Sequence, residues 1–419
     1  MADRVDAIVI GAGAAGLAAA RDLSSAGKSV AILEARQRIG GRIFTLHETN
    51  LPLPIELGAE FIHGEAEETF KIVEAGAFLA YELPNNRWIS DRGKFRRLPN
   101  FWATTKRIRM RIPARGRDVS FAEFLNKQRN LSPRLKAMMM NFAEGYNAAH
   151  ADRLSAKSLR ATEDEEDDPK QWRVADGYDS VIESLRAGLD PSRSTLHLGC
   201  EATEVKWSRG SVEVTSRKGE TFHAAAAVIT IPIGVWKSAD AIRFDPPLRE
   251  KERAIRKLEV GHVVKVVLGF HERFWDPERV FVVSRDPFMP TWWTTNPVRS
   301  SMLTGWAGGH AADRMLAAQD LTDRALQSLA SVFGVKRREI DSKLDSVHVH
   351  NWQADPFSRG AYSYASVGGE LAHETLARQV DGTLFFAGEA TTPYETGTVA
   401  GAIGTGRRAA KQLLKSLAK

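Results

Sequence analysis

One run near the N-terminus has the residue types and the spacing that bind phosphate. Residues Gly11 to Gly16 read GAGAAG. In such a run Gly11 permits a tight turn, Gly13 lets the backbone approach a pyrophosphate, and Gly16 allows a helix to pack closely on a strand. A helix that begins here directs backbone N–H groups toward phosphate. Glu34 lies eighteen residues after Gly16, where a carboxylate can accept hydrogen bonds from ribose hydroxyls. The run therefore predicts a dinucleotide site.

A second candidate is a lysine within an apolar run. Lys265 stands in Val263 to Phe270, which reads VVKVVLGF. A buried ammonium group is costly unless it has a partner. Two interpretations are open: an edge strand whose lysine reaches water, or a buried lysine with a chemical role.

The elements that must position the glycine turn follow from the local sequence. Val5 to Ile10 is a short apolar run that ends at glycine, which is typical of a buried parallel strand. Ala14 to Ala26 is rich in Ala and Leu without Pro and predicts a helix. Val30 to Leu33 predicts a second buried strand with Glu34 at its end. A right-handed crossover places both strands in one parallel sheet.

Further strand and helix signals occur later in the chain. Val212 to Thr215 and Thr221 to His223 flank Lys218-Gly219 as a hairpin, and Ala227 to Ile231 predicts a buried strand. Leu384 to Ala387 predicts a strand that precedes a helix beginning at Val399. We expect these pieces to join the nucleotide-binding sheet.

The remaining segments predict a second domain. Phe121 to Glu144 reads as helices, whereas Val263 to Phe270 and Met302 to Trp306 read as strands. The predicted fold class is α/β, with a Rossmann-like dinucleotide-binding domain interleaved with an α+β domain. The expected boundaries are 1–70, 172–245 and 355–419 for the first domain, and 71–171 and 246–354 for the second.

Composition sets the broad class. The 419 residues are 43% hydrophobic and include 33 glycines, which fits an ordinary globular α/β protein. The single cysteine, Cys200, excludes an internal disulfide and a cysteine-built metal site. No metal is expected, and the cysteine count agrees with a reducing cytoplasm. No signal peptide is recognised, and Arg407 to Lys419 predicts an amphipathic helix too short and too charged to be a transmembrane anchor.

Charge is unevenly distributed along the chain. The net charge is +6, and residues 87–117 contain eleven Lys or Arg. This segment is either a patch for an acidic partner or a solvated face. No nucleic-acid-binding motif accompanies it, so no nucleic acid is expected. The acidic run Glu163 to Asp168 predicts an exposed loop that could steer cations.

Several motifs together resemble the flavin amine oxidases, the family of monoamine and polyamine oxidases. Phe385 to Thr392 reads FFAGEATT, Gly397 to Ala402 reads GTVAGA, and Glu56 to Gly64 reads ELGAEFIHG. With the glycine turn and Gly40-Gly41-Arg42, the resemblance covers nearly the whole chain. It implies FAD as the cofactor and the two-domain fold of that family. Ala361 occupies the position of the flavin-linking cysteine of covalent relatives, so non-covalent FAD is expected.

The resemblance also implies a set of cofactor contacts. Thr398 and Val399 would direct backbone N–H groups at the flavin pyrimidine oxygen. Glu389 would contact the ribityl or pyrophosphate region. The full expected cofactor-binding set is Gly11, Gly13, Ala14, Ala15, Gly16, Glu34, Ala35, Arg36, Gly40, Gly41, Arg42, Gly58, Ala59, Glu60, Phe61, Val205, Trp352, Gly388, Glu389, Thr398 and Val399.

The implied reaction is the oxidation of an amine. A hydride passes from the α-carbon of the amine to flavin N5, the imine hydrolyses to a carbonyl compound, and O2 is reduced to H2O2. Lys265 would hold a water against N5. An alkylamine with a pKa of about 10.4 is neutral in roughly one of two thousand molecules at pH 7, and an apolar pocket favours that form. A dedicated general base is therefore not expected.

The resemblance places the substrate pocket as well. Tyr362 would form one wall, whereas Thr398 occupies the position of a second tyrosine, and His63 could touch the substrate. Trp292, Trp293 and Trp306 are either pocket or core residues. The motif around His63 favours polyamine-like or secondary amines, for which Glu60 and Glu395 are candidate acidic residues near the entrance.

Three other functions remain open at this point. An L-amino-acid oxidase requires an arginine for the substrate carboxylate, and the sequence does not place one. A C–C desaturase of the same superfamily generally lacks the lysine matched by Lys265. A flavin-bearing binding protein with little turnover would use the basic segment 87–117 to dock a partner.

Overall fold

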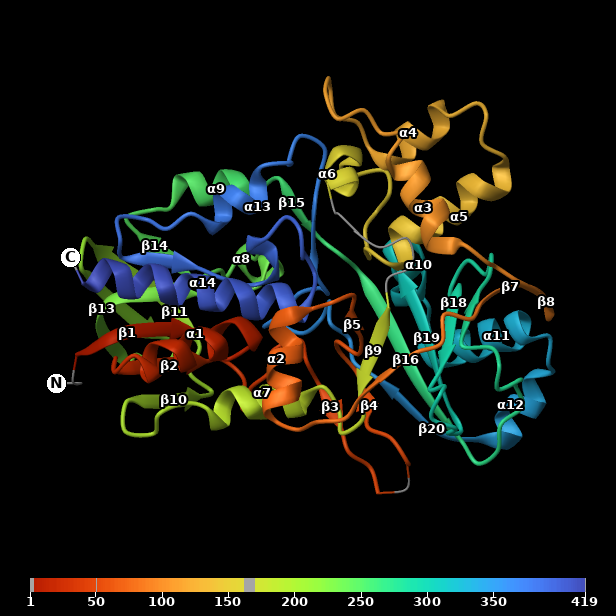
Figure 1. Ribbon diagram of the computed structural model, residues 1–419, viewed down its shortest axis with the longest axis horizontal. Helices are drawn as coiled ribbons and strands as arrows, with labels where there is room; N and C mark the ends of the chain where they lie inside the picture. The colour runs from red at the N-terminus through yellow and green to blue at the C-terminus, as the bar shows by residue number, and fades with distance from the viewer. Residues whose placement is uncertain (1–3, 50, 162–169, 419) are drawn as a thin grey trace.

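The computed structural model describes residues 4–49, 51–161 and 170–418. Two large β-sheets form the two halves of the molecule, which appear left and right in Figure 1. The first and last labelled elements of the chain, β1 and α14, both lie in the left-hand half (Figure 1). The predicted acidic loop, Glu163 to Asp168, falls outside the described residues.

The N-terminal unit is the predicted strand–helix–strand element. β1 (Val5–Ile10) leads into α1 (Ala14–Ser25), which returns the chain to β2 (Val30–Glu34). The two strands are parallel, with Ala7 opposite Val30. This prediction is confirmed, and Glu34 stands at the end of the second strand as expected.

Six further strands complete the eight-stranded sheet. Its order is β10-β2-β1-β13-β12-β11-β14, and β22 also pairs with β13. The added strands are β10 (Ser194–Leu198), β11 (Ala202–Ser208), β12 (Ser211–Ser216), β13 (Thr221–Ile229), β14 (Arg243–Asp245) and β22 (Leu384–Phe386).

One strand prediction was wrong in detail. The hairpin strand Thr221 to His223 and the buried strand Ala227 to Ile231 are a single strand, β13. No Gly or Pro interrupts the run between them, so nothing ends the strand. Its first half pairs with β12 and its last three residues pair with β22, so these two strands share one edge of β13 while β1 pairs with the other edge.

The second sheet has seven strands in the order β20-β16-β19-β18-β17-β7-β8. β7 runs parallel to β17, so residues 87–97 join a sheet otherwise built from residues 263–349. The strands are β7 (Arg87–Asp91), β8 (Lys94–Arg97), β16 (Val263–Phe270), β17 (Phe281–Val283), β18 (Thr291–Thr294), β19 (Met302–Gly308) and β20 (Leu344–Val349). The domain boundaries expected from the sequence stay a prediction.

Helices cover both sheets. α14 (Val399–Leu417) packs along α1, and the predicted helix at Arg407 is its C-terminal part (Figure 1). α10 (Gly309–Leu316), α11 (Leu321–Phe333) and α12 (Arg337–Lys343) belong to the core of the second sheet. The other helices are α2 (Glu67–Ala75), α7 (Asp179–Ala187), α8 (Ile233–Trp236), α9 (Arg249–Ile255), α13 (Ala372–Ala377) and a 3₁₀ turn at Glu389–Thr391.

A group of helices stands above the second sheet, at the upper right of Figure 1. It consists of α3 (Phe101–Arg109), α4 (Phe121–Lys127), α5 (Pro133–Gly145) and α6 (Ala156–Ala161). The helices expected over 121–144 are confirmed as two, because Ser120 and Ser132 each cap a new start by accepting a hydrogen bond from a first-turn N–H at 3.2 Å.

Short strands connect these layers. They are β3 (Thr45–Leu46), β4 (Ile55–Glu56), β5 (Ile62–His63), β6 (Ala80–Glu82), β9 (Gln171–Val174), β15 (Leu258–Val260) and β21 (Ser363–Ala365). Within the described ranges, none of the helices is both long and apolar enough to cross a bilayer.

Candidate active site

A cavity of about 1020 Å³ is lined by residues of both large sheets and of the helices above the second one. Its size is at the upper end for a small-molecule site, which leaves room for a dinucleotide and a small substrate together. Every residue of the expected cofactor-binding set lines this cavity except Gly16 and Val205, and so do Lys265, His63 and Tyr362. The structure thus brings together segments that are far apart in the sequence.

The two exceptions have different physical reasons. A Cβ on Gly16 would lie 1.9 Å from the Gly11 carbonyl oxygen, so this glycine serves the close strand–helix packing. Val205 is a correction: its side chain is fully buried in the sheet core with Val212 and Phe244. Ala202, at the start of β11, lines the cavity instead. A register irregularity between Ala202 and Glu204 separates these two parts of the strand.

The glycine turn forms an open cradle at the start of α1. Gly11 has a φ of +104°, which favours glycine, whereas a Cβ on Gly13 would have no heavy atom within 4 Å. That open space faces the first turn of α1, which carries no acidic side chain. The first N–H groups of a helix have no partner within the helix. This end can therefore receive an anionic group such as a pyrophosphate.

Glu34 is fixed beside this cradle. It is 4% exposed, and its carboxylate accepts the backbone N–H groups of Ala12 and Arg36, each at 2.8 Å. Each carboxylate oxygen has more than one acceptor position. Glu34 therefore holds the turn in place and keeps acceptor capacity for ribose hydroxyls.

Glu389 joins three segments of the cavity wall. It is paired with Arg42 at 2.9 Å, and it accepts the Ser363 hydroxyl at 2.8 Å and the Gly397 N–H at 3.2 Å. Burial acts to raise the pKa of this carboxyl, but Arg42 and Ser363 outweigh burial and hold the pKa below its usual value. Arg42 also donates to the Ala361 carbonyl oxygen. Glu389 is therefore ionised and organises the wall.

The start of α14 is capped by Thr398. The Thr398 hydroxyl accepts the Gly401 N–H at 2.9 Å, and the Thr398 N–H itself donates to the Glu395 carbonyl oxygen at 3.3 Å. Of the two N–H groups expected to face the cofactor, that of Thr398 thus has an internal partner. The N–H of Val399, at the first position of the helix, has no acceptor within the helix.

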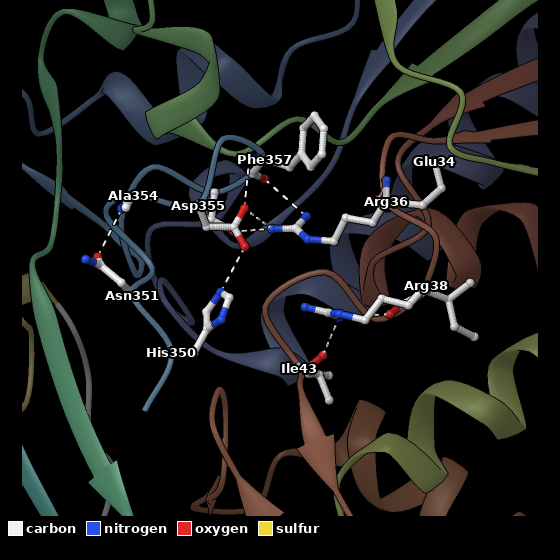
Figure 2. Close-up of polar contacts among 11 residues, drawn as sticks. Glu34, Arg36, Arg38, Ile43, His350, Asn351, Ala354, Asp355 and Phe357 are labelled. Atoms are coloured by element: carbon white, nitrogen blue, oxygen red, sulfur yellow. Dashed lines mark hydrogen bonds and ion pairs between the residues drawn. The ribbon is translucent and has the colours of Figure 1, made fainter. Parts of the chain in front are cut away.

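Arg36 ties the glycine-rich side of the cavity to a distant loop, as Figure 2 shows. Its guanidinium contacts Asp355 at 2.6 Å and the Ser358 hydroxyl at 2.8 Å. His350 contacts the other carboxylate oxygen of Asp355 at 2.9 Å. Although burial acts to raise the pKa of Asp355, His350 and Arg36 hold that pKa far below its usual value. The side chain of Arg36 is thus engaged with protein.

Lys265 lies in the interior of the second sheet. β16 pairs with β19 on one side and β20 on the other, and Lys265 is 2% exposed. The edge-strand interpretation is therefore wrong. The ammonium group lies 2.6 Å from Glu60 and donates to the Gly58 carbonyl oxygen at 3.2 Å. Two of its three N–H donors are used, which leaves one for a water or ligand in the cavity.

Glu60 is the anionic partner of two buried cations. One oxygen lies 2.5 Å from Arg173 and accepts the indole N–H of Trp293 at 3.0 Å, and the other faces Lys265. Burial acts to raise the pKa of Glu60, but Arg173 and Lys265 outweigh it and hold the pKa below its usual value. Arg173, which carried no sequence signal, lies on β9.

The acidic entrance expected for a polycation is a second correction. Glu60 is an interior ion-pair partner with a side chain that is 9% exposed. Glu395 is exposed but does not line the cavity. The expectation for Glu60 is therefore wrong, because sequence position does not reveal which side chains have interior partners.

His63 is a neutral group in the cavity wall. Burial and the positive charge of Arg87 lower its pKa to about 4. Its Nδ1 lies 3.3 Å from the Gln171 side-chain nitrogen. An amide NH2 can only donate, so Nδ1 accepts and the proton of the neutral ring is on Nε2. His63 therefore offers a hydrogen-bond donor without a charge.

Aromatic rings form the wall next to His63. Tyr146 lies edge-on to His63 at 5.5 Å and stacks on Phe142 at 5.6 Å. The Tyr362 hydroxyl donates to the Tyr146 carbonyl oxygen at 2.7 Å. Tyr362 was predicted from its motif, whereas Tyr146, Phe142 and Trp102 were not, because no local pattern marks a ring that lines a cavity built from distant segments.

Of the three tryptophans that could belong to either the core or the pocket, one belongs to the core and two line the cavity. Trp292 is fully buried in the core of the second sheet. Trp293 and Trp306 line the cavity, and their indole N–H groups donate to Glu60 at 3.0 Å and to the Gly145 carbonyl oxygen at 2.7 Å.

The basic segment 87–117 contains both exposed residues and a residue of the cavity wall. Arg92, Lys94 and Arg96 are exposed on the β7–β8 hairpin, in agreement with a solvated face. Arg87 instead lines the cavity, with its guanidinium 4.8 Å from the Trp102 ring centroid and 4.6 Å from that of Phe281. One member of the basic segment thus belongs to the candidate site.

The parallel β1–β2 pair, the open glycine turn and the carboxylate at the end of β2 are the features of a nucleotide-binding α/β fold. A family model described as flavin containing amine oxidoreductase matches residues 14–414. The chain belongs to this family, and it is a flavin-dependent amine oxidase, an oxidoreductase acting on CH–NH groups.

Similar proteins agree with this assignment. Polyamine oxidase 3 of Oryza sativa subsp. japonica is 33% identical, over 97% of this chain and 88% of its own length. Polyamine oxidase 2 of Arabidopsis thaliana is 32% identical, over 96% of this chain and 87% of its own length. A solved structure of wild-type putrescine oxidase bound to putrescine has a TM-score of 0.83 at 20% identity, covering 99% of both chains. This last likeness establishes the shared two-domain fold.

Proposed function

We propose that the protein binds FAD non-covalently and oxidises polyamine-like or secondary amines to carbonyl compounds, with O2 as acceptor and H2O2 as product. The observation that carries this proposal is Lys265, a buried ammonium group on the wall of the same cavity as the glycine cradle. The proposed location is the cytoplasm, in keeping with a single cysteine, Cys200, that has no possible disulfide partner in the chain.

The cavity fits the cofactor. The space beside Gly13 and the first turn of α1 suit a pyrophosphate, and Glu34 suits a ribose. Gly388 has a φ of +124° and no heavy atom within 4 Å of a Cβ, so it adds a second open stretch of backbone. Ala361 lines the cavity without a nucleophile, which supports non-covalent binding. When bound, the flavin supplies a hydride acceptor at N5.

The chain's own residues would handle the amine and the water. Aromatic walls around His63 exclude water and favour the neutral amine over its ammonium form. His63, neutral with a proton on Nε2, can hydrogen-bond the substrate without repelling a second amino group. Lys265 has one N–H donor left, which can position a water for imine hydrolysis and provide positive charge where oxygen is reduced.

The polyamine-like substrate class draws support from the two polyamine oxidases of similar sequence. A secondary amine whose reacting nitrogen is neutral suits the same aromatic cavity. The panel of substrates must therefore separate charge number from amine type.

Anaerobic mixing of the flavin-loaded protein with amines tests this function. The panel is spermine, spermidine, N-acetylated polyamines, putrescine, benzylamine, tyramine and L-amino acids, and the readout is loss of visible flavin absorbance. Rapid bleaching by one amine class, reversed by air with release of H2O2, is the expected result. Slow recovery in air would contradict O2 as the acceptor. No bleaching by any amine would contradict the proposed substrate class.

A further inference from the structure

Three histidines and three carboxylates gather outside the amine-oxidising cavity, where the loop after α5 meets the start of β16 and α10. The members of this His–carboxylate cluster are Glu144, His150, Asp152, His262, His310 and Asp313. The reaction proposed above uses none of them. The expectation of no metal rested on the cysteine count, which says nothing of sites built from histidine and aspartate.

Three members of the cluster direct ligand atoms at one point. Asp313 places one oxygen 2.7 Å from His150 Nε2 and the other 2.6 Å from His262 Nδ1. The potential ligand atoms of these three residues all lie within 4.8 Å of one another. In a tetrahedral Zn²⁺ site with bonds of about 2.0–2.1 Å, ligand atoms lie about 3.3 Å apart. Shifts of about 1 Å at the side-chain ends convert one arrangement into the other.

The surroundings hold one ligand rigid and leave the others open. His150 is 4% exposed, and its Nδ1 lies 3.3 Å from the Tyr364 hydroxyl. A metal-binding histidine usually has its second ring nitrogen fixed in this way. The side chains of His262 and Asp313 are 39% and 42% exposed. An ion can therefore enter from solvent, and a water can complete its coordination.

We propose that His150, His262 and Asp313 bind a Zn²⁺ ion. Two neutral imidazoles and one carboxylate are a ligand set that Zn²⁺ accepts, with the fourth position open to water. The ion ties together the loop after α5, the first residue before β16 and the helix α10. Because the cluster lies outside the cavity, the ion does not take part in the reaction and its role is structural. His262 lies three residues before Lys265, so the ion would hold the start of the strand that carries this lysine. This proposal is independent of the amine substrate.

The test uses flavin-loaded protein without a polyhistidine tag, freed of metal by a chelator and then titrated with ZnCl2 in a calorimeter. The expected result is about one equivalent bound with a micromolar Kd. Zn²⁺ at a hundred times that Kd raises Tm by about 3 °C. Co²⁺ in place of Zn²⁺ gives the visible absorption bands of a four- or five-coordinate site.

Variants decide whether the binding belongs to this cluster. Asp313→Asn and His262→Asn each weaken Zn²⁺ binding by about 10-fold or more, and His262 is the safer variant because its side chain is partly exposed. The matched control is His271→Asn, which removes an exposed histidine that faces Asp345 at 3.7 Å on the same sheet. Unchanged flavin absorbance shows that each variant is folded.

Two outcomes would overturn the proposal. Absence of saturable Zn²⁺ binding in the intact protein would mean that the cluster is a hydrogen-bonded network only. Zn²⁺ binding that persists unchanged in both Asp313→Asn and His262→Asn would place the ion elsewhere. Loss of amine oxidation in the same preparations would bear on the proposed function and leave this result unaffected.

Discussion

At the scale of single residues, the chemistry depends on how Lys265 is held. Glu60 and the Gly58 carbonyl oxygen take two of its N–H donors, and Glu60 has a second cation, Arg173, at 2.5 Å. Replacing Lys265 with methionine keeps the length of the side chain and leaves Glu60 paired with Arg173. The substitution therefore removes the ammonium group and leaves the Glu60 carboxylate with one positively charged partner.

We expect Lys265→Met to slow the oxidative half-reaction selectively. Loss of a preorganised positive donor typically costs about 100-fold in rate, so reoxidation of the reduced flavin by O2 falls by about that factor. Reduction by the amine changes little. Stopped-flow measurement of the two half-reactions checks this, with Lys206→Met, at an exposed lysine on β11, as control. Equal slowing of both halves would assign Lys265 to packing alone.

His63 supplies the pH dependence that can be calculated at this scale. Its pKa is about 4 in the folded protein, against about 6.5 unfolded. Below pH 6.5 the unfolded chain therefore binds a proton that the folded protein does not bind. Stability rises with pH wherever the unfolded state binds more protons, so this residue costs stability progressively as the pH falls from 6.5 to 4.

Comparison of wild type with His63→Gln isolates that contribution. Glutamine keeps a side-chain donor and has no titration, so the Tm of the wild type minus that of the variant should decline between pH 6.5 and 4 and stay level above pH 7. Thermal unfolding of the flavin-loaded proteins across this range is the measurement. A constant difference would show that His63 titrates in the folded protein as it does in water.

At the scale of elements, the turn before α1 separates two roles that a glycine can have. A Cβ on Gly13 meets open space, at a φ of −76° that any residue adopts, whereas a Cβ on Gly16 meets the Gly11 carbonyl oxygen at 1.9 Å. Gly13→Ala should therefore fold normally and bind flavin weakly, because the new methyl group occupies the phosphate space. Gly16→Ala should unfold more easily even without flavin.

Flavin content and stability without flavin distinguish the two variants. Gly13→Ala should be purified with a flavin-to-protein absorbance ratio reduced about 10-fold, and its flavin-free Tm should equal that of the wild type. Gly16→Ala should lose about 1–3 kcal/mol of stability from overpacking. Full flavin content in Gly13→Ala would place the pyrophosphate elsewhere.

The elements found from the sequence are those whose signals are local. β1, α1 and β2 were found because glycine, helix and strand patterns follow one another within thirty residues, and α14 because its start follows a motif. Arg173 and Tyr146 were missed because their contacts join residues more than a hundred positions apart. Val205 was misplaced because an irregular strand register cannot be read from one strand's sequence.

At the scale of the whole molecule, the cavity is formed by segments that are far apart in the sequence, and an ion pair joins two of them. Arg36 and Asp355 are more than three hundred residues apart, and their side chains are 11% and 9% exposed. Arg36 follows the strand that carries Glu34, and Asp355 precedes the segment that carries Tyr362. The pair therefore joins the expected cofactor wall to the expected substrate wall (Figure 2).

The variant Asp355→Asn tests the contribution of this ion pair to stability. Removing one partner of a buried ion pair costs about 3–5 kcal/mol because the other charge stays buried. We expect a loss toward the lower end of that range at pH 7, because Arg36 keeps the Ser358 hydroxyl at 2.8 Å as a partner. Urea unfolding at a series of pH values is the measurement. Asp345→Asn, at a more exposed aspartate 3.7 Å from His271, is the control.

The pH dependence gives the sharper criterion. The pKa of Asp355 is depressed in the folded protein, so its contribution is present above the unfolded pKa of about 3.9 and is lost as the pH falls through the lower folded value. The difference between wild type and Asp355→Asn should therefore be constant from pH 5 to 8 and shrink only below about pH 4. A difference that already shrinks as the pH falls from 7 to 5 would contradict a depressed pKa for Asp355 in the folded protein.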